Sequence, residues 1–173
     1  IEHQIVQTLP QLLSETSGHV LVFLPGLGEI NRTQKAIASC TWAEDFHVQK
    51  LYGDLPAKDQ DSVLRNSKQR RVILSTNVAE TSLTIPGVTG VIDSGLVRTM
   101  KVDSQIGLPK LQLESISQAS AEQRTGRAGR TSSGLCYRLW PSAVHRSRPV
   151  EDAPEITRCD FANALLMLSA WGE

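Results

Sequence analysis

The sequence predicts an α/β fold with a mostly parallel sheet, because short apolar runs alternate with helical patterns along most of the chain. The run HVLVFLP (19–25) is apolar without alternation, which is typical of a strand buried on both faces. The segment GEINRTQKAIASC (28–40) then places Ile30 and Ile37 on one face of a helix. Such alternation indicates helices on both faces of the sheet. We expect strands at 19–25, 46–53, 70–77, 87–95 and 134–140, and helices at 28–40, 56–66 and 118–129.

Two segments depart from this alternation. Residues 96–116 contain two stretches of period two around DSQIG, which predict an antiparallel hairpin inserted into the α/β unit. Residues 147–158 are rich in proline and polar side chains and predict a linker. We therefore assign residues 1–146 to one domain. We expect residues 159–173 to form the first helix of a following domain, because this helix has little left in the chain to cover.

The composition narrows the class of protein. The 173 residues carry 18 basic and 18 acidic side chains, which argues against a purely electrostatic nucleic-acid binder. The three cysteines lack metal-ligand spacing, so we expect no metal site and a reduced, cytoplasmic protein. No apolar run approaches the roughly 20 residues of a membrane span. The chain begins at Ile1 rather than methionine, and we expect it to be part of a longer protein.

Polar residues follow the predicted strands, at the sheet edge where open α/β folds bind ligands. The richest segment is STNVAETSLTI (75–85), in which neutral donors can bind a sugar–phosphate backbone with little net charge. Glu80 would repel phosphate, so we expect it to cap a helix or organise the loop. The neutral donors are Ser75, Thr76, Asn77, Thr81, Ser82 and Thr84.

The segment QRTGRAGR (123–130) predicts an anion-binding site. If residues 118–129 are helical, Gln123, Arg127 and Arg130 fall within about 60° of one face, and Arg124 lies off it. Guanidinium forks aimed together suit the oxygens of a polyphosphate. The glycines of this segment cost about 1 kcal/mol each in a helix, which favours close approach of a ligand. A surface arginine stripe paired with distant acids is the alternative.

The sequence lacks two other parts of a nucleotide hydrolase. It has no G-x-x-x-x-G-K-[ST] phosphate loop, and no Asp-Glu pair ends an apolar strand to hold Mg²⁺. We therefore expect that this chain alone does not hydrolyse a nucleotide.

Five motifs together resemble a known family. In order, VLVFLPGLGEI, LYGDLP, STNVAETSLTIPGV, VIDSG and QRTGRAGR are similar to the second RecA-like domain of DEAH-box (DEAH/RHA, superfamily 2) ATP-dependent RNA helicases, over about residues 1–145. The tail PEITRCDFANALLMLSAWG resembles the start of the winged-helix domain that follows in that family. FLPGLGEI and the final WGE resemble the bacterial HrpB-like branch.

The resemblance implies a site for ATP, or another NTP, between this domain and a preceding RecA-like domain that carries the phosphate loop and holds Mg²⁺. Gln123, Arg127 and Arg130 match positions that reach the β- and γ-phosphates, with the arginines as arginine fingers. Pro86 stands where many relatives carry an acid that touches the ribose, so the resemblance leaves open whether this chain makes that contact. The other nucleotide-binding matches are Thr76 and Thr84 near the ribose, Leu64 against the adenine, and Ser82, which couples nucleotide state to its loop.

The same resemblance implies a partner RNA, bound as a single strand through its backbone, together with a C-terminal winged-helix domain and later domains of the same protein. The hairpin at 96–116 matches one that abuts the nucleic acid and helps to separate strands. The RNA-binding candidates are Gly26, Thr76, Asn77, Thr81, Arg98 and Lys101.

Three functions remain open at this point. The chain is the second motor domain of an RNA helicase, or part of an NTPase that translocates, remodels or acts on DNA, or a phosphate-binding scaffold without motor activity. The intact Gln123, Arg127 and Arg130 disfavour the scaffold. The motifs read mainly the phosphate backbone, so they do not separate RNA from DNA.

Overall fold

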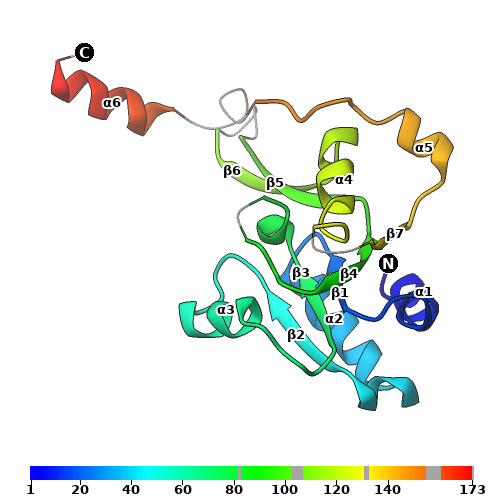
Figure 1. Ribbon diagram of the computed structural model, residues 1–173. Helices are drawn as coiled ribbons and strands as arrows, with labels where there is room; N and C mark the ends of the chain where they lie inside the picture. The colour runs from blue at the N-terminus through cyan, green and yellow to red at the C-terminus, as the bar shows by residue number, and fades with distance from the viewer. Residues whose placement is uncertain (82, 103–106, 131–132, 155–160, 173) are drawn as a thin grey trace.

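A parallel sheet of five strands forms the centre of the computed structural model, in the order β2–β3–β1–β4–β7 (Figure 1). The structure describes residues 1–81, 83–102, 107–130, 133–154 and 161–172. All neighbouring strands of this sheet run parallel, as the alternation of strands and helices predicts. The strands are β1 (His19–Phe23), β2 (His47–Leu51), β3 (Arg71–Ser75), β4 (Val88–Asp93) and β7 (Leu135–Arg138).

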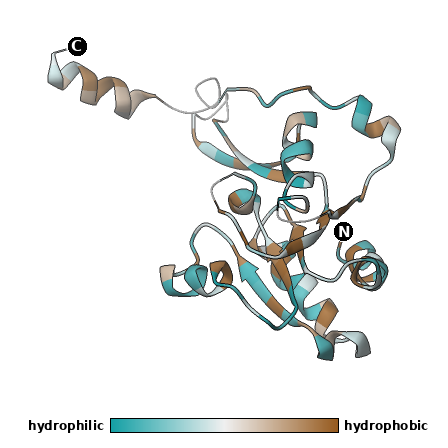
Figure 2. Ribbon diagram, viewed as in Figure 1, coloured by the Kyte–Doolittle hydropathy of each residue, from teal (hydrophilic) through white to brown (hydrophobic). Residues whose placement is uncertain are grey.

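Helices cover both faces of this sheet. Successive side chains of β1 alternate between two apolar clusters, with Val20 and Val22 on one face and Leu21 and Phe23 on the other. Figure 2 shows the apolar residues gathered on the central strands. The described helices are α1 (Glu2–Glu15), α2 (Leu27–Ala38), α3 (Ala57–Leu64), α4 (Gln118–Thr125), α5 (Ser142–Arg146) and α6 (Ala162–Trp171), with short 3₁₀ helices η1 (Thr41–Asp45) and η2 (Asn77–Ala79).

Helix α1 is an addition to the fold expected from sequence. It buries Ile5, Leu9, Leu12 and Leu13, a spacing that places all four on one face against α2 and the sheet. Pro10 lies inside this helix on its exposed side, where the loss of one backbone hydrogen bond is tolerated. The core on this face is therefore larger than the sequence pattern alone indicated.

The predicted hairpin is present as a separate two-stranded sheet. Strand β5 (Leu96–Val102) pairs antiparallel with β6 (Pro109–Ser115), from Leu96 opposite Ser115 to Val102 opposite Pro109. Residues 103–106, which belong to the expected turn, lie outside the described residues. The hairpin projects from the carboxyl edge of the parallel sheet (Figure 1).

Helix α4 is shorter than predicted: it ends at Thr125 rather than at residue 129. Beyond it the backbone bonds shift to three-residue spacing, with Arg127 N donating to Arg124 O and Ala128 N to Thr125 O, both at 3.1 Å. Two glycines within four residues lower the helix propensity enough to explain the change. Ser117 caps the start of α4, since its Oγ accepts from Ser120 N at 3.0 Å.

The chain after α5 begins packed against the domain. Residues 147–154 have no helix or strand, which fits a linker, yet Arg148 is buried. Helix α6 lies away from the sheet in Figure 1, and the side chains described on it are exposed. Residues 155–160, which span the end of the expected linker and the expected start of this helix, lie outside the described part. None of the described helices combines the length and the apolar character that a membrane span needs.

Candidate functional site

The polar strand ends predicted from sequence lie at one edge of the sheet, because all five strands run in the same direction. Strand β3 ends at Ser75 and leads directly into η2, and β4 ends at the buried Asp93. Helix α4 and the root of the hairpin lie above this edge (Figure 1). The segment 76–85 and the segment 123–130, distant in sequence, thus come together.

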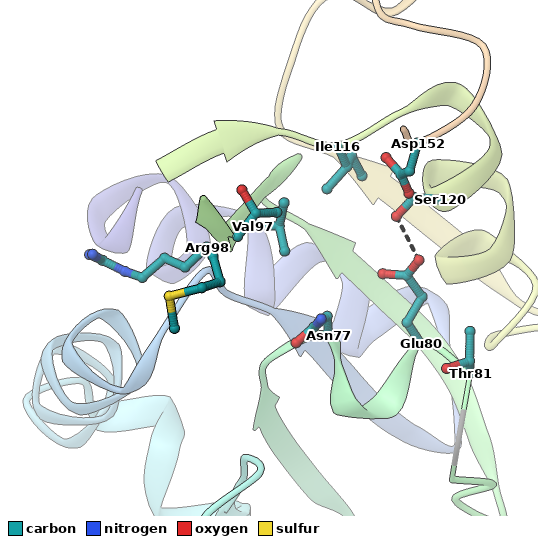
Figure 3. A pocket seen from close by; sticks show the side chains of 10 residues that line it. Asn77, Glu80, Thr81, Val97, Arg98, Ile116, Ser120 and Asp152 are labelled. Carbon is teal, nitrogen blue, oxygen red and sulfur yellow. Dashed lines mark hydrogen bonds between the residues drawn. The ribbon is translucent and has the colours of Figure 1, made fainter. Parts of the chain in front are cut away.

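Glu80 connects these two segments. Its carboxylate accepts a hydrogen bond from Ser120 Oγ at 2.7 Å (Figure 3) and another from Arg124 Nε at 2.8 Å. Its backbone carbonyl accepts from Arg127. The prediction that Glu80 organises the loop agrees with these contacts, and pairing with Arg124 offsets the charge that would otherwise repel phosphate.

Arg124 is a buried anchor rather than a ligand-facing arginine. Its side chain is 1% exposed and its Nη1 lies 2.9 Å from Asp93 Oδ1, while its guanidinium group stacks over Phe23 at 4.8 Å from the ring centre. Burial raises the pKa of Asp93, and the charge of Arg124 lowers it only in part. The sequence-based expectation that Arg124 lies off the ligand-facing side agrees with this position.

Gln123, Arg127 and Arg130 line one open depression of about 310 Å³. Arg127 Nη1 donates to Leu83 O at 2.7 Å, and Arg130 Nη1 donates to Thr84 Oγ1 at 2.5 Å. Burial lowers the pKa of the Arg127 guanidinium, and the neighbouring charge of Arg130 lowers it further. An anion in this depression would relieve the repulsion between the two cations.

The glycines of the arginine segment are not required by packing among the described residues. A Cβ placed on Gly129 would have no described atom within 4 Å, and one on Gly126 would meet only backbone carbonyls at 3.4 and 3.5 Å. The backbone beside the two arginines is therefore open to an approaching group.

The other nucleotide-binding candidates are only partly brought together. Thr84 is exposed and bonded to Arg130, beside the depression. Leu64 is half-buried and packs against the apolar cluster beneath α3. Thr76 begins η2, with its backbone N donating to Leu51 O at 3.1 Å. Ser82 lies outside the described residues.

A second cavity, of about 320 Å³, lies between η2, the hairpin and α4 (Figure 3). It contains three of the RNA-binding candidates, Asn77, Thr81 and Arg98, and it shares Glu80 and Thr81 with the depression beside Arg127 and Arg130. Its other lining residues are Val97, Thr99, Met100, Ile116, Ser120 and Asp152.

Gly26 and Arg98 lie together, whereas Lys101 does not join them. A Cβ on Gly26 would come within 2.9 Å of Arg98 Nε, so glycine permits the close approach of this arginine and a larger residue would displace the Arg98 side chain. Successive side chains of a strand point to opposite faces, so Lys101 lies on the other face of β5 from Arg98 and pairs there with Glu114. The structure therefore brings the Gly26 loop and the hairpin together through Arg98.

Sequence reasoning missed Glu29, which positions Arg98. The Glu29 carboxylate is buried and accepts hydrogen bonds from Arg98 Nη2 and Arg32 Nη2, each at 2.9 Å. Burial raises the pKa of Glu29, but hydrogen bonds from its own backbone and from the two arginines outweigh this and hold it below the usual value. A glutamate three residues after the Gly26 cap was the available signal, since this is where capping glutamates occur.

Comparison with known proteins gives the family. The profile of the helicase conserved C-terminal domain matches residues 4–132. The chain is 39% identical over 168 residues to the ATP-dependent RNA helicase HrpA of Escherichia coli, covering 97% of this chain and 13% of HrpA. It is 45% identical over 159 residues to the probable ATP-dependent RNA helicase DHX34 of Mus musculus, covering 90% of this chain and 14% of DHX34.

A solved structure agrees with these matches. The crystal structure of the Escherichia coli DEAH/RHA helicase HrpB superimposes with a TM-score of 0.90 at 36% identity, covering 100% of this chain and 22% of that one. This likeness supports the predicted resemblance to the HrpB-like branch. The chain spans about a fifth or less of the length of these relatives. It belongs to the helicase conserved C-terminal domain family, within the DEAH-box RNA helicase group that includes HrpA and HrpB.

Proposed function

We propose that this chain is the second motor domain of an ATP-dependent RNA helicase, in which Arg127 and Arg130 act on the γ-phosphate of ATP. The observation that carries the proposal is the open depression lined by these two arginines and Gln123. Two cations held beside each other, with exposed glycine backbone between them, suit a polyphosphate. The buried anchor of Arg124, Glu80 and Asp93 holds the segment in place.

In this proposal the nucleotide is presented by a preceding RecA-like domain of the same protein. Closure of the two domains brings Arg127 and Arg130 to the charge that develops on the transferring phosphoryl group, and Gln123 orients the polyphosphate. Among the described residues, no group of three or more His, Cys, Asp or Glu side chains is placed to hold a metal. The proposal leaves Mg²⁺ mainly to the preceding domain, while this chain supplies positive charge and hydrogen bonds.

RNA binds in the second cavity, where Asn77, Thr81 and Arg98 reach its backbone. The hairpin beside this cavity separates the strands. Because Glu80 and Thr81 line both cavities, a change at the nucleotide side reaches the RNA side through a single loop. The ion pair with Glu29 already holds the Arg98 side chain in position, so RNA binding does not have to order this side chain.

RNA-stimulated ATP hydrolysis by the parent protein, wild type against Arg130→Ala, tests the arginine role. We expect turnover to fall by about 10³-fold or more while ATP affinity is largely kept, because the charge acts in the transition state. Arg130 is exposed and bonded only to Thr84 among the described residues, so the fold should tolerate its removal. The matched control is Arg146→Ala, an exposed arginine on α5.

Near-normal turnover in Arg130→Ala would mean that the arginine segment is structural and that the proposed motor function is wrong.

A second experiment separates the helicase from the translocase or remodeller. It measures strand displacement by the wild-type parent protein on matched RNA and DNA duplexes. Displacement of RNA supports the helicase, whereas ATP hydrolysis without displacement indicates a translocase or remodeller.

A further inference from the structure

The root of the hairpin is held by an arginine from outside the recognised motifs. Arg148 Nη1 donates to Gly95 O at 2.8 Å and to Ile116 O at 2.9 Å. Gly95 immediately precedes β5 and Ile116 immediately follows β6, so one guanidinium nitrogen bridges both strands where they leave the domain. Ile116 N also donates to Gly95 O at 3.1 Å, which closes the root.

Arg148 is packed tightly at this position. Its side chain is 8% exposed and its guanidinium group lies over the ring of Trp140, 4.3 Å from the ring centre. A Cβ on Gly95 would come within 2.5 Å of Arg148 Nη2 and 2.6 Å of Trp140 Cε3. Gly95 has φ +72°, so the turn and the close contact both require glycine.

The segment that carries Arg148 also holds the start of α4. Gln118 N donates to Pro149 O at 2.9 Å, and Ala119 N donates to Val150 O at 3.0 Å. Gln118 Nε2 donates to Arg148 O at 2.9 Å. The first-turn amides of α4, which a helix leaves without internal partners, are thus satisfied by residues 149 and 150.

Arg124 contacts the same root from the side of α4. Arg124 pairs with Asp93, whose Oδ1 also accepts a hydrogen bond from Gly95 N at 2.8 Å. The Nη1 of Arg124 also lies 3.3 Å from Leu96 O. The hairpin root is therefore held between one buried arginine on α4 and another on the chain that leaves the domain.

We propose that Arg148 is a positioning residue for strand separation, which fixes the hairpin relative to α4 and to the chain that follows. The inference rests on the proposed function, because it assigns the hairpin a role in displacing the RNA strand. Arg148 touches neither cavity, so its removal changes how force from nucleotide turnover reaches the hairpin rather than turnover itself.

The test compares the parent protein with Arg148→Ala, measuring RNA duplex displacement and RNA-stimulated ATP hydrolysis on the same preparation. We expect displacement to fall by about tenfold, the scale of a lost mechanical coupling, with hydrolysis changed by less than about twofold. Arg146→Ala is the matched control, since Arg146 is exposed on α5 and its side chain forms no hydrogen bond or ion pair with another described residue, and it should leave both rates unchanged. Arg148→Lys keeps a buried donor without the flat guanidinium stack, and we expect an intermediate loss.

Two outcomes would overturn the inference while leaving the helicase function intact. Unchanged displacement in Arg148→Ala shows that the root does not need this contact. A parallel fall in displacement and hydrolysis, with a lowered melting temperature, shows a purely structural role. If Arg148→Ala does not fold, Arg148→Lys decides by the same ratio of displacement to hydrolysis. A wild-type parent that hydrolyses ATP but displaces no strand would overturn the helicase function, and the inference with it.

Discussion

At the scale of single residues, the site depends on charges that are neutralised within the protein. Asp93 is fully buried and its Oδ1 lies 2.9 Å from Arg124 Nη1, and Arg124 also binds Glu80. A buried ion pair of this kind adds little net stability, but removal of one partner leaves the other without compensation. Arg124 therefore contributes to function by holding the loop at Glu80, although it faces neither cavity.

Removal of Arg124 should destabilise the whole domain. In Arg124→Met we expect the free energy of unfolding to fall by about 3–5 kcal/mol, because Asp93 then stays buried without its cation. Urea denaturation of the chain measures this loss. The comparison variant is Lys101→Ala, whose ion pair with Glu114 is partly exposed and should be worth about 1 kcal/mol or less. Equal losses in the two variants would contradict the burial argument.

At the scale of elements, the carboxyl edge of the sheet and the turn after α4 together make the site. The turn keeps Arg127 and Arg130 on the same side because three-residue spacing places side chains at i and i+3 in line. The sequence-based prediction reached the same grouping through a longer helix, which was wrong beyond Thr125. The opposite edge of the sheet, at the amino ends of the strands, carries the buried side chain of His19.

His19 links the amino ends of β1 and β3 and should make stability depend on pH. Its Nδ1 accepts from Arg71 N at 3.3 Å, and burial lowers its pKa, with the charges of Arg71 and Arg70 lowering it further. As the pH falls below the ordinary histidine pKa of 6.5, the unfolded chain therefore binds a proton at His19 more readily than the folded chain does. We expect the urea concentration at the unfolding midpoint to decrease as the pH is lowered from about 7.5 to about 5.5.

The variant His19→Gln provides the control for this pH dependence, because an amide oxygen can accept from Arg71 N without titrating. It should flatten the decline in midpoint over the same pH interval. A decline as steep as in the wild type would show that other groups cause it.

At the level of the whole molecule, the proposed function requires that this chain carry one side of each binding site. It spans 13% of HrpA and 22% of the solved HrpB chain, and its sequence has no phosphate loop. The depression beside Arg127 and Arg130 is open, as expected for a surface completed by another domain. The two cavities share Glu80 and Thr81, so in the proposed function one loop connects the nucleotide side with the RNA side.

The isolated chain should not hydrolyse ATP. Its arginines can stabilise charge on a phosphoryl group but cannot present that group, so we expect no hydrolysis above the buffer rate with or without RNA. Release of phosphate from the purified chain, with the parent protein as the positive control, checks this. RNA-stimulated release by the chain alone would contradict the division of labour between two domains.

Local sequence patterns were enough to predict the five strands of the main sheet, the helices at 28–40, 56–66 and 118–129 in outline, the hairpin, the polar segment after β3 and the arginine segment 123–130. These features depend on local patterns, such as the unbroken apolar run in β1 and the period-two alternation in β5 and β6, and local patterns can be read from one chain. Helix α1 buries an equally periodic set of side chains, but the sequence-based prediction did not include this helix.

Which residues meet depends on the fold and could not be predicted from local patterns. Arg124 finds Glu80 and Asp93 at separations of 44 and 31 residues, and Arg148 finds Gly95 at a separation of 53. Arg98 joins Glu29 across 69 residues, whereas Lys101, three positions further on, turns to the opposite face. The physical reason is that a guanidinium group is placed by the packing of the elements around it. The sequence shows which charges exist, and the fold selects the partner of each.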